Sequence, residues 1–261
     1  MKQFAVIGDP IAHSLSPILH QEVYRQLGLD ASFKKIHLMP NSLHSFMNVN
    51  EFDGFNVTIP YKQSVIPFLD ELDESAQTIG AVNCVHDGKG YNTDWIGFTK
   101  AMEQNGISLS GKDYLILGAG GAARAIAFGL VKFGAKSISI KNRTQSKEDQ
   151  LLDWINSIFP NNNANENSDV IVNCTPLGMW PDTESMPDLE VKKEQTLADT
   201  IYNPLETKWL KTGRERGAKT IGGLDMFIGQ GLASIDIWFG EKISEKIKLE
   251  PIKKVLKSQL C

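Results

Sequence analysis

The sequence predicts an α/β protein of two domains, and three observations support this. The chain has 261 residues, enough for two medium-sized domains at ~100–200 residues each. Short runs of β-branched and aromatic residues alternate with helical patterns, which is typical of mainly parallel sheets. A glycine turn between a strand pattern and a helix pattern indicates a Rossmann-like second domain. We expect the first domain to be α/β with a mostly parallel mixed sheet, and a ligand cleft to lie between the domains.

The first part of the chain predicts four strands and two helices. The segment HDGKGYN predicts a hairpin turn, which brings antiparallel pairing into the first sheet. Ser16 is a favourable N-cap and Pro17 suits the first helical position, so a helix should begin there. The expected strands lie at about 2–8, 33–39, 54–60 and 81–86, and the expected helices at about 17–27 and 62–79.

The second part predicts a βαβ unit and further strands. A helix from Thr93 to about Asn105 leads into the connector GISLSGKD, so a domain boundary is expected near 95–110. YLILGAGGAARAIAFGLVKFGA then predicts strand, glycine turn and helix, SISIKN the next strand, and NNNANEN a polar loop. Later strands are expected at about 169–174, 197–202 and 219–222, followed by helices. Residues 1–100 with 225–261 should form the first domain, and 101–224 the second.

Composition favours a small-molecule partner and a reducing compartment. The formal net charge is −4 and the basic residues are dispersed, so no footprint for nucleic acid is present. The N-terminus lacks the apolar region of a signal peptide, and no apolar run reaches the ~18 residues of a membrane helix. The cysteines are odd in number and widely spaced, and the histidines show no ligand spacing. We expect a cytoplasmic protein with no metal. The cysteines are Cys84, Cys174 and Cys261.

The segment GAGGAA matches a dinucleotide fingerprint. Gly118 permits the tight turn, Gly120 lets the backbone approach a pyrophosphate, and Ala123 occupies the third position, where alanine is allowed. The helix that follows presents unpaired N–H groups to an anion. A merely structural turn is the alternative, but the strand before it and the helix after it favour nucleotide binding.

The end of the next strand favours NADP(H) over NAD(H). An NAD-selective fold places an acid there, whereas KNRTQSK has no acid before Glu148. The Arg143 guanidinium can donate two N–H bonds to a 2′-phosphate, which a carboxylate would repel. A solvated arginine is the alternative.

Polar side chains gather where the strands of the first domain end. In GFNVTIPYK, Asn56 and Thr58 share one strand face, while Phe55, Val57 and Ile59 share the other. Open α/β sheets bind ligands outside the carboxyl ends of their strands. These residues therefore suit a hydroxyl-bearing ligand.

Other loops of the first domain carry similar groups. HSLSP presents Ser14 and Ser16 before a helix, an arrangement suited to a carboxylate or polyol, although Ser16 taken alone is explained by N-capping. AVNCV and YNTDWIG add Asn83, Asn92 and Asp94. Turn chemistry explains each separately, but not their accumulation in one domain beside a nucleotide module.

Ordered motifs along almost the entire chain resemble the shikimate dehydrogenase family. They run from GDPIAHSLSP through FNVTIPYK, GAVNCV, YNTDWIG, GAGGAARA, NRT and NCTPLGM to YNPLET and GLDMFIGQG. The resemblance implies a cytoplasmic enzyme, monomeric or homodimeric, that interconverts 3-dehydroshikimate and shikimate with NADP(H) on the route to chorismate and aromatic amino acids.

The resemblance also implies roles for individual residues. Lys62 and Asp94 match the catalytic pair: Lys62 would supply a proton and positive charge at the reacting oxygen, and Asp94 would hold its ammonium. Substrate binding is implied for Ser14, Ser16, Asn56, Thr58, Asn83, Tyr202 and Gln230, with Asp94 also contacting a ring hydroxyl. Cofactor binding is implied for Gly118, Gly120, Gly121, Ala122, Asn142, Arg143, Thr144, Lys147, Gly223 and Met226.

The chain departs from the family pattern at two places. Lys147 stands where an arginine is common, which keeps the charge but loses the planar fork. The stretch between NRT and NCTP is short, with NNNANEN where relatives often have another strand and helix.

Three other functions are compatible with parts of the sequence. A quinate-type dehydrogenase would share most of the site, but the SLS pair and NRTQSK favour shikimate and NADP. A methylene-tetrahydrofolate dehydrogenase would share the architecture without HSLSP or FNVTIPYK. A non-catalytic NADP-binding module would be expected to lack Lys62 or Asp94.

Overall fold

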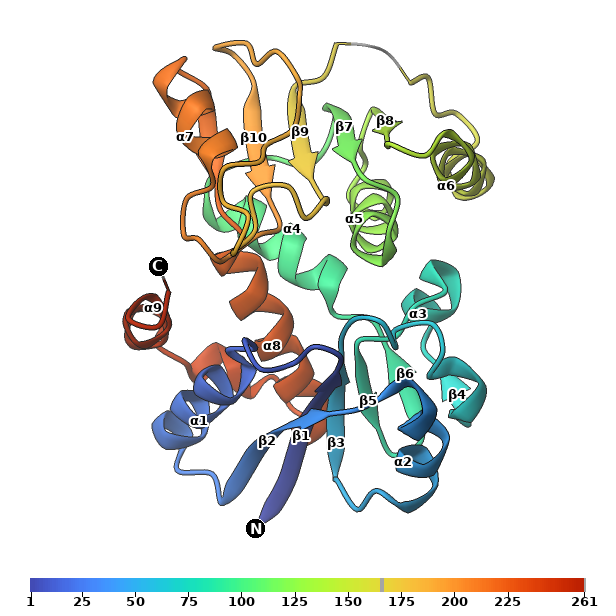
Figure 1. Cartoon of the computed structure of the whole chain (residues 1–261), viewed down its shortest axis with the longest axis vertical. Coiled ribbons are helices and arrows are strands. Elements are labelled where there is room, and N and C mark those ends of the chain that lie inside the picture. Colours follow the sequence, from blue (N-terminus) through green and yellow to red (C-terminus); the bar gives the residue numbers. More distant parts are fainter. Residues whose placement is uncertain (165–166, 261) are drawn as a thin grey trace. The chain divides into compact units, whose positions relative to one another are not determined.

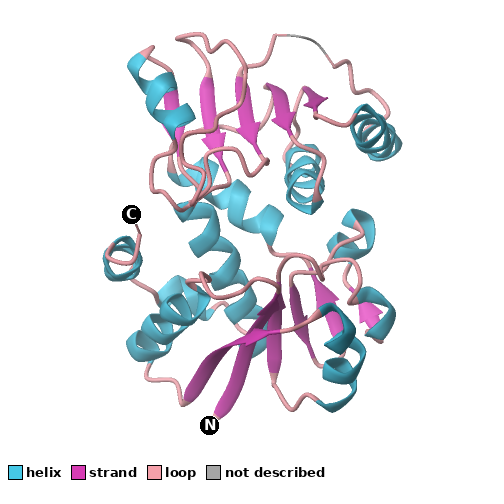
Figure 2. Ribbon diagram, in the orientation of Figure 1, coloured by secondary structure: helices cyan, strands magenta, loops and turns pink. Residues whose placement is uncertain are grey.

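The computed structural model describes residues 1–164 and 167–260 and divides into two compact units (Figure 1). Unit 1 comprises Met1–Thr93 and Gln230–Gln259, and unit 2 comprises Asp94–Gly229. Each unit has its own sheet with helices packed around it (Figure 2), so the predicted α/β class is confirmed. Helix α8 (Leu224–Phe239) runs through the division between the units.

Unit 1 contains a six-stranded mixed sheet with the order β2-β1-β3-β5-β6-β4. Strand β1 pairs in parallel with β2 and β3, whereas β5 runs antiparallel to both β3 and β6. The predicted hairpin turn is confirmed: Asp87 and Gly88 join β5 to β6 with φ values of 46° and 73°. The strands are β1 (Lys2–Gly8), β2 (Ala31–His37), β3 (Gly54–Val57), β4 (Glu71–Leu72), β5 (Cys84–His86) and β6 (Lys89–Tyr91).

Helices from both ends of the chain cover this sheet. In the core, the Phe4 ring of β1 stacks on Trp238 of α8, with 4.5 Å between ring centroids. Besides most of α8, the helices are α1 (Ser16–Leu27), α2 (Leu43–Val49), α3 (Glu74–Ile79) and α9 (Leu249–Lys257), with 3₁₀ turns at Pro40–Ser42, Ile66–Phe68 and Ile243–Lys246.

The prediction of one helix over 62–79 is wrong. Pro67 lies in the 3₁₀ turn Ile66–Phe68, and β4 follows instead of a continued helix. Proline cannot donate the backbone bond that a helix interior requires. A new helix, α3, begins only after Asp73, whose carboxylate accepts the N–H groups of Ser75 and Ala76.

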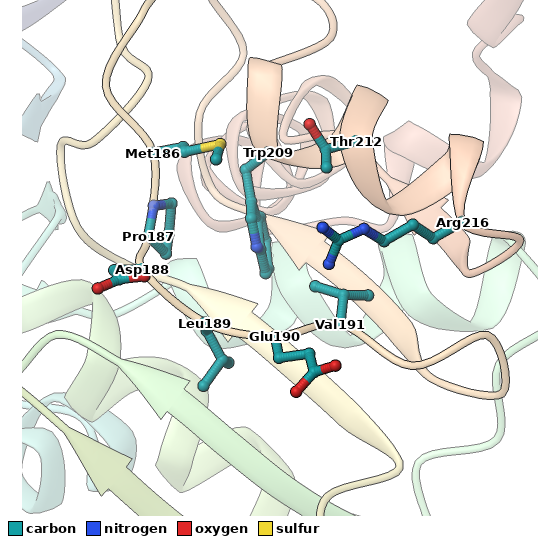
Figure 3. A pocket seen from close by; sticks show the side chains of 9 residues that line it. All are labelled: Met186, Pro187, Asp188, Leu189, Glu190, Val191, Trp209, Thr212 and Arg216. Atoms are coloured by element: carbon teal, nitrogen blue, oxygen red, sulfur yellow. The ribbon is translucent and has the colours of Figure 1, made fainter.

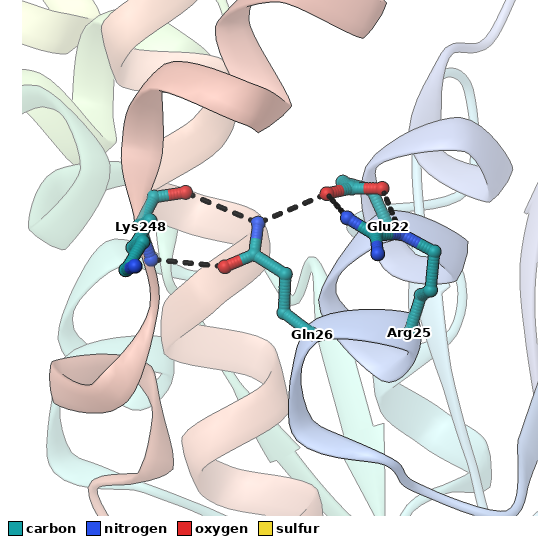
Figure 4. Close-up of polar contacts among 4 residues, drawn as sticks. All are labelled: Glu22, Arg25, Gln26 and Lys248. Atoms are coloured by element: carbon teal, nitrogen blue, oxygen red, sulfur yellow. Dashed lines mark hydrogen bonds and ion pairs between the residues drawn. The ribbon is translucent and has the colours of Figure 1, made fainter.

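A polar contact fastens the C-terminal segment to α1 (Figure 4). The Gln26 side chain donates to the Lys248 carbonyl over 3.1 Å and accepts the Lys248 N–H over 3.0 Å. Gln26 is itself held by Glu22, which also forms a two-pronged ion pair with Arg25. Residues far apart in the chain are thereby joined within unit 1.

Unit 2 contains a five-stranded sheet, parallel throughout, with the order β11-β10-β9-β7-β8. This is the predicted Rossmann-like pattern. Its strands are β7 (Asp113–Leu117), β8 (Ser137–Lys141), β9 (Val170–Asn173), β10 (Thr196–Asp199) and β11 (Lys219–Ile221), and its helices are α4 (Asp94–Gln104), α5 (Gly121–Lys132), α6 (Gln145–Ile158) and α7 (Lys208–Glu215). Residues 165–166 of the predicted polar loop lie outside the described residues.

Two cores stabilise unit 2. Ile126 and Leu130 of α5 pack with Tyr114 and Ile116 of β7, and a second cluster surrounds Trp209 of α7. Among helices in the described part of the chain, none has the length and apolar character required to span a membrane.

Candidate active site

The topology of unit 1 gathers the predicted substrate residues at one edge of its sheet. Ser14 and Ser16 follow β1, and Thr58 and Lys62 follow β3, which is parallel to β1. Asn83 precedes β5, but β5 is antiparallel to β3, so its beginning lies beside the end of β3. These side chains therefore belong to the same sheet edge.

The serine loop has a local hydrogen-bonded structure. The Ser14 N–H donates to the Ile11 carbonyl, the Ser14 hydroxyl donates to Ser16 Oγ over 3.2 Å, and the Ser16 N–H donates to Ser14 Oγ over 3.3 Å. The N-cap position of α1 is held by Leu15, with no side-chain cap. The prediction that Ser16 acts as N-cap is therefore wrong, because the helix already includes this residue.

Two residues of β2 hold the serine loop from the neighbouring strand. Lys35 Nζ donates to the Ala12 carbonyl over 2.6 Å, and His37 Nε2 lies 2.8 Å from Asp9 Oδ1. Sequence reasoning missed both contacts. The available signal was the alignment of parallel strands, since the residues after β1 and those ending β2 lie at the same edge.

Asn56 and Thr58 have different surroundings at the end of β3. The Asn56 amide is buried and donates to the Asn83 carbonyl over 3.1 Å and to Ser234 Oγ of α8 over 2.8 Å. Thr58 is only partly buried and lies past the strand end. Asn56 thus connects strands and helix. Of the three residues expected on the apolar face, Phe55 and Val57 are buried, whereas Ile59 is 71% exposed.

A buried clamp fixes the start of α4, and hence the Asp94 backbone. The side-chain oxygen Oδ1 of Asn83 accepts the Thr93 N–H over 2.7 Å, and the side-chain nitrogen Nδ2 of Asn83 donates to the Thr93 hydroxyl over 2.9 Å. Asp94 is the next residue and is buried. Gln230 lies one turn before Ser234 on α8, and the Ser234 hydroxyl donates to its carbonyl.

Lys62 follows a tight turn. The Tyr61 N–H donates to the Thr58 carbonyl over 2.9 Å, and the Tyr61 hydroxyl donates to the Leu38 carbonyl. The Lys62 carbonyl accepts the Val82 N–H over 2.7 Å, which holds the backbone of this lysine beside the segment leading to Asn83. The position of Lys62 at the sheet edge is therefore determined by backbone contacts on both sides.

In unit 2, the glycine loop lies at the carboxyl end of β7. Gly118 has φ of 105°, a conformation that favours glycine, and a Cβ there would crowd the Cys174 carbonyl at 3.1 Å. At Gly120 and Gly121, an added Cβ would meet no described atom within 4 Å. Packing within the protein therefore does not explain glycine at these two positions. The open space instead favours the close approach of a ligand to the backbone.

This difference makes Gly120→Ala a selective probe. We expect the variant to retain the thermal stability of the parent, because Gly120 has a negative φ of −94° and open space around it. NADP affinity should fall by about tenfold or more if the backbone at Gly120 touches the pyrophosphate. Calorimetric titration with NADP, alongside thermal unfolding, tests this. Unchanged affinity would contradict the assignment.

The NRT loop lies beside the glycine loop, since the Gly118 N–H donates to the Lys141 carbonyl at the end of β8 over 2.8 Å. Arg143, Thr144 and Lys147 are exposed. Within the described residues, neither Arg143 nor Lys147 forms an ion pair with a carboxylate. The loop therefore offers two cations at the edge where the fingerprint helix begins.

The last predicted group, Tyr202, Gly223 and Met226, meets at the beginning of α8. The Tyr202 and Phe227 rings have centroids 4.6 Å apart, and a Cβ on Gly223 would lie 2.5 Å from the Thr200 carbonyl. Gly223 is thus required for this close backbone approach. Met226 packs in the core of unit 2.

Asp199 organises the loop that carries Tyr202, and sequence reasoning missed it. Its carboxylate accepts bonds from the Ile201 N–H, the Thr207 hydroxyl and the Asn173 amide at 2.9 to 3.2 Å. Burial raises the pKa of Asp199 to about 6, although these donors oppose the change. An acid at the end of a buried strand was the available signal.

A cavity of about 600 Å³ lies elsewhere in unit 2, between the segment before β10 and helix α7 (Figure 3). None of the predicted site residues lines it. Its lining consists of Met186, Pro187, Asp188, Leu189, Glu190, Val191, Trp209, Thr212 and Arg216. Among the described residues, no cluster of side chains suited to a metal ion was found.

Two family models match this chain. Residues 6–85 match the shikimate dehydrogenase substrate binding domain, and residues 100–177 match shikimate / quinate 5-dehydrogenase. The chain is 40% identical to a shikimate dehydrogenase (NADP⁺) of Shouchella clausii, over 94% of this chain and 95% of the relative.

Solved structures show the same fold. Shikimate 5-dehydrogenase of Thermus thermophilus, in complex with NADP(H) and shikimate, matches with a TM-score of 0.87 and 32% identity over the whole of both chains. The ligand-free 5-ketofructose reductase of a Gluconobacter strain matches with a TM-score of 0.86 and 31% identity over 98% of each chain. From the sequence matches to the relative and the family models, the chain belongs to the shikimate dehydrogenase family.

Proposed function

We infer that this chain catalyses the NADPH-dependent, reversible reduction of 3-dehydroshikimate to shikimate, in the pathway to chorismate and aromatic amino acids. The observation that carries this conclusion is the match to shikimate dehydrogenases (NADP⁺) over almost the whole chain. The gathering of serine, threonine, asparagine and lysine side chains at one sheet edge of unit 1 supports it, because such groups suit a hydroxylated carboxylic acid.

The residues of unit 2 fit NADP(H). The open space at Gly120 and Gly121 and the start of α5 suit a pyrophosphate, and the exposed cations of Arg143 and Lys147 suit a 2′-phosphate. When bound, NADPH supplies the hydride for the ketone carbon. Gly118, Ala122, Asn142 and Thr144 complete the proposed cofactor segment, with Gly223 and Met226 proposed on the nicotinamide side.

We assign the proton chemistry to Lys62 and Asp94. As the ketone is reduced, its oxygen gains negative charge and needs a proton, which a lysine ammonium can donate. The Asp94 carboxylate would stabilise that ammonium and accept a substrate hydroxyl bond. In the reverse direction, neutral Lys62 would take the hydroxyl proton.

The remaining first-unit residues would bind the substrate. The hydroxyls of Ser14 and Ser16 donate hydrogen bonds to its carboxylate, and the side chains of Thr58, Asn83 and Gln230 bind its ring hydroxyls. Tyr202 would lie near the carboxylate. Asn56 would act through its bonds to the Asn83 carbonyl and Ser234, supporting the wall to which Thr58 belongs.

The 5-ketofructose reductase match shows that this fold also occurs in a reductase of another name, so the fold alone does not decide the substrate. Product identification tests the reaction directly. Purified protein incubated with 3-dehydroshikimate and NADPH should form shikimate, identified by chromatography and mass spectrometry. Consumption of neither compound would contradict the proposed reaction.

Arg143→Ala tests the cofactor assignment. Loss of a charge-assisted contact should weaken NADP(H) binding by about 1.5–3 kcal/mol, while NAD(H), which lacks the 2′-phosphate, should be affected much less. Calorimetric titration of both cofactors measures the two losses. Equal losses would contradict contact between Arg143 and the 2′-phosphate.

We further propose a cytoplasmic location. Cys84 and Cys174 are both free thiols, which is typical of a reducing compartment. A monomer or homodimer stays a prediction.

A further inference from the structure

Glu148 directly follows the basic segment proposed to bind the 2′-phosphate, where an acid is unexpected. It is half-buried in the first turn of α6, next to the exposed Lys147. A carboxylate near a phosphate is repulsive, so its presence in this turn requires a physical explanation.

The Glu148 carboxylate is bonded to the turn itself. Oε2 accepts the backbone N–H of Asn142 over 2.6 Å, and Oε1 accepts the Gln145 amide over 3.2 Å. Asn142 is the first residue after β8, and Arg143 is the residue that follows it. The bond to Glu148 thus holds the backbone on the strand side of Arg143.

The other side of Arg143 is held as well. The Thr144 carbonyl accepts the Asn142 amide over 2.9 Å and the N–H groups of Lys147 and Glu148 at 3.1 and 3.2 Å. Arg143 therefore lies between two residues tied to the first turn of α6. Without the Glu148 carboxylate, the Asn142 N–H and the Gln145 amide would each lose a bond, whereas the bonds to the Thr144 carbonyl would remain.

The location also reduces the electrostatic cost of the acid. A carboxylate in the first turn of a helix interacts favourably with the helix dipole, and a bond from a backbone N–H stabilises its charge. Both carboxylate oxygens accept bonds from donors of this turn. The negative charge is thereby compensated locally.

The body of α6 is fixed independently of this turn. The Arg124 guanidinium of α5 lies 4.4 Å from the centre of the Trp154 ring of α6, a cation–π contact. Removing the Glu148 side chain should therefore loosen the Asn142–Thr144 turn without displacing the helix.

We propose that Glu148 is a positioning residue for NADP(H) selectivity: by accepting the Asn142 N–H, it orders the turn that presents Arg143 to the 2′-phosphate. This inference rests on the proposed cofactor site.

The test compares Glu148→Ala with Glu148→Gln, using calorimetric titration of the full chain with NADP and with NAD. Glutamine keeps an acceptor for the Asn142 N–H and removes the charge, so it separates the hydrogen bond from electrostatics. We expect Glu148→Ala to weaken NADP by about tenfold and NAD by less than about twofold, as loss of one bond to a charged group implies. Glu148→Gln should stay within about threefold of the parent for both.

A gain in NADP affinity in both variants would overturn the proposal, because repulsion by the acid would then dominate. Equal losses for NADP and NAD, or no loss in Glu148→Ala, would overturn it as well.

The Arg143→Ala background separates failure of this inference from failure of the cofactor site. If Glu148 acts by ordering Arg143, adding Glu148→Ala to Arg143→Ala should cost little further NADP affinity. If Arg143→Ala alone leaves NADP selectivity unchanged, the proposed site itself fails. If Arg143→Ala lowers selectivity but Glu148→Ala does not, only the role of Glu148 is rejected.

Discussion

Lys62→Ala is expected to lower kcat by ~10²–10⁴, with little change in the KM for shikimate. In shikimate oxidation Lys62 is proposed to accept the hydroxyl proton; loss of a positioned proton acceptor has effects of this size, and an interaction made mainly in the transition state lowers kcat rather than ground-state binding. Steady-state kinetics with shikimate and NADP measure both constants. The fold should persist, because the contacts that hold this position involve the Lys62 backbone.

Lys34→Ala is the matched control. Lys34 lies exposed on β2, where its ammonium donates to the Gln3 side chain over 3.3 Å. Its removal should leave kcat unchanged. If Lys62→Ala also kept the kcat of the parent, the proposed chemical role of Lys62 would be rejected.

His20→Phe is expected to reduce the loss of unit 1 stability, measured as the free energy of unfolding, that occurs as the pH falls. His20 is fully buried in α1, and its ring stacks on Phe33 with 4.0 Å between ring centroids. Burial lowers the pKa of His20 to about 3. Between about pH 3 and 6.5 the unfolded chain binds a proton that the native state does not. The free energy of unfolding therefore falls as the pH falls through this range.

The difference between the ordinary pKa of 6.5 and about 3 corresponds to about 5 kcal/mol over the full range, an upper bound on the contribution of His20. Phenylalanine keeps the ring stack and cannot be protonated. Hydrogen exchange of α1 and β1 peptides, measured at several pH values and corrected for intrinsic rates, reports the stability of unit 1 directly.

His44→Phe provides the control, because His44 is exposed on α2, whereas His20 is fully buried in α1. Its replacement should leave the pH dependence as in the parent. The same acid slope in His20→Phe and the parent would contradict the role assigned to His20.

Local signals in the sequence predicted much of the fold. In β7 and α5, an apolar run predicts the strand, a glycine motif predicts the turn at Gly118, and an amphipathic pattern predicts the helix. Between β5 and β6, the residue pair Asp87-Gly88 is typical of a hairpin turn. Each signal depends on neighbouring residues only, so no tertiary information was needed.

The errors have a common physical cause. The helix over 62–79 was predicted from pattern, but Pro67 and the Asp73 cap divide it. Ser16 has the right chemistry for an N-cap, yet α1 begins one residue earlier than capping by Ser16 requires. In both cases the sequence pattern indicates a helix but does not determine the residue at which it begins or ends.

The supporting contacts of the site could not be predicted, since they join distant parts of the chain. Asn56 of β3 bonds to Ser234 of α8, which is far away in the chain. Lys35 bonds to the Ala12 carbonyl because β2 pairs with β1. Asn56 belongs to the family motif FNVTIPYK, but only the structure reveals that its amide donates hydrogen bonds to the Asn83 carbonyl and to Ser234. The motif predicts which residues matter and leaves open how each acts.

The most direct test of the account measures kcat/KM for NADPH or NADH formation with shikimate or quinate, each offered with NADP or NAD. We predict that shikimate with NADP gives much the largest value of the four. Equal or greater turnover with quinate or with NAD would contradict the proposed substrate and cofactor, and no activity in any mixture, with NADP still bound, would indicate a non-catalytic NADP-binding protein.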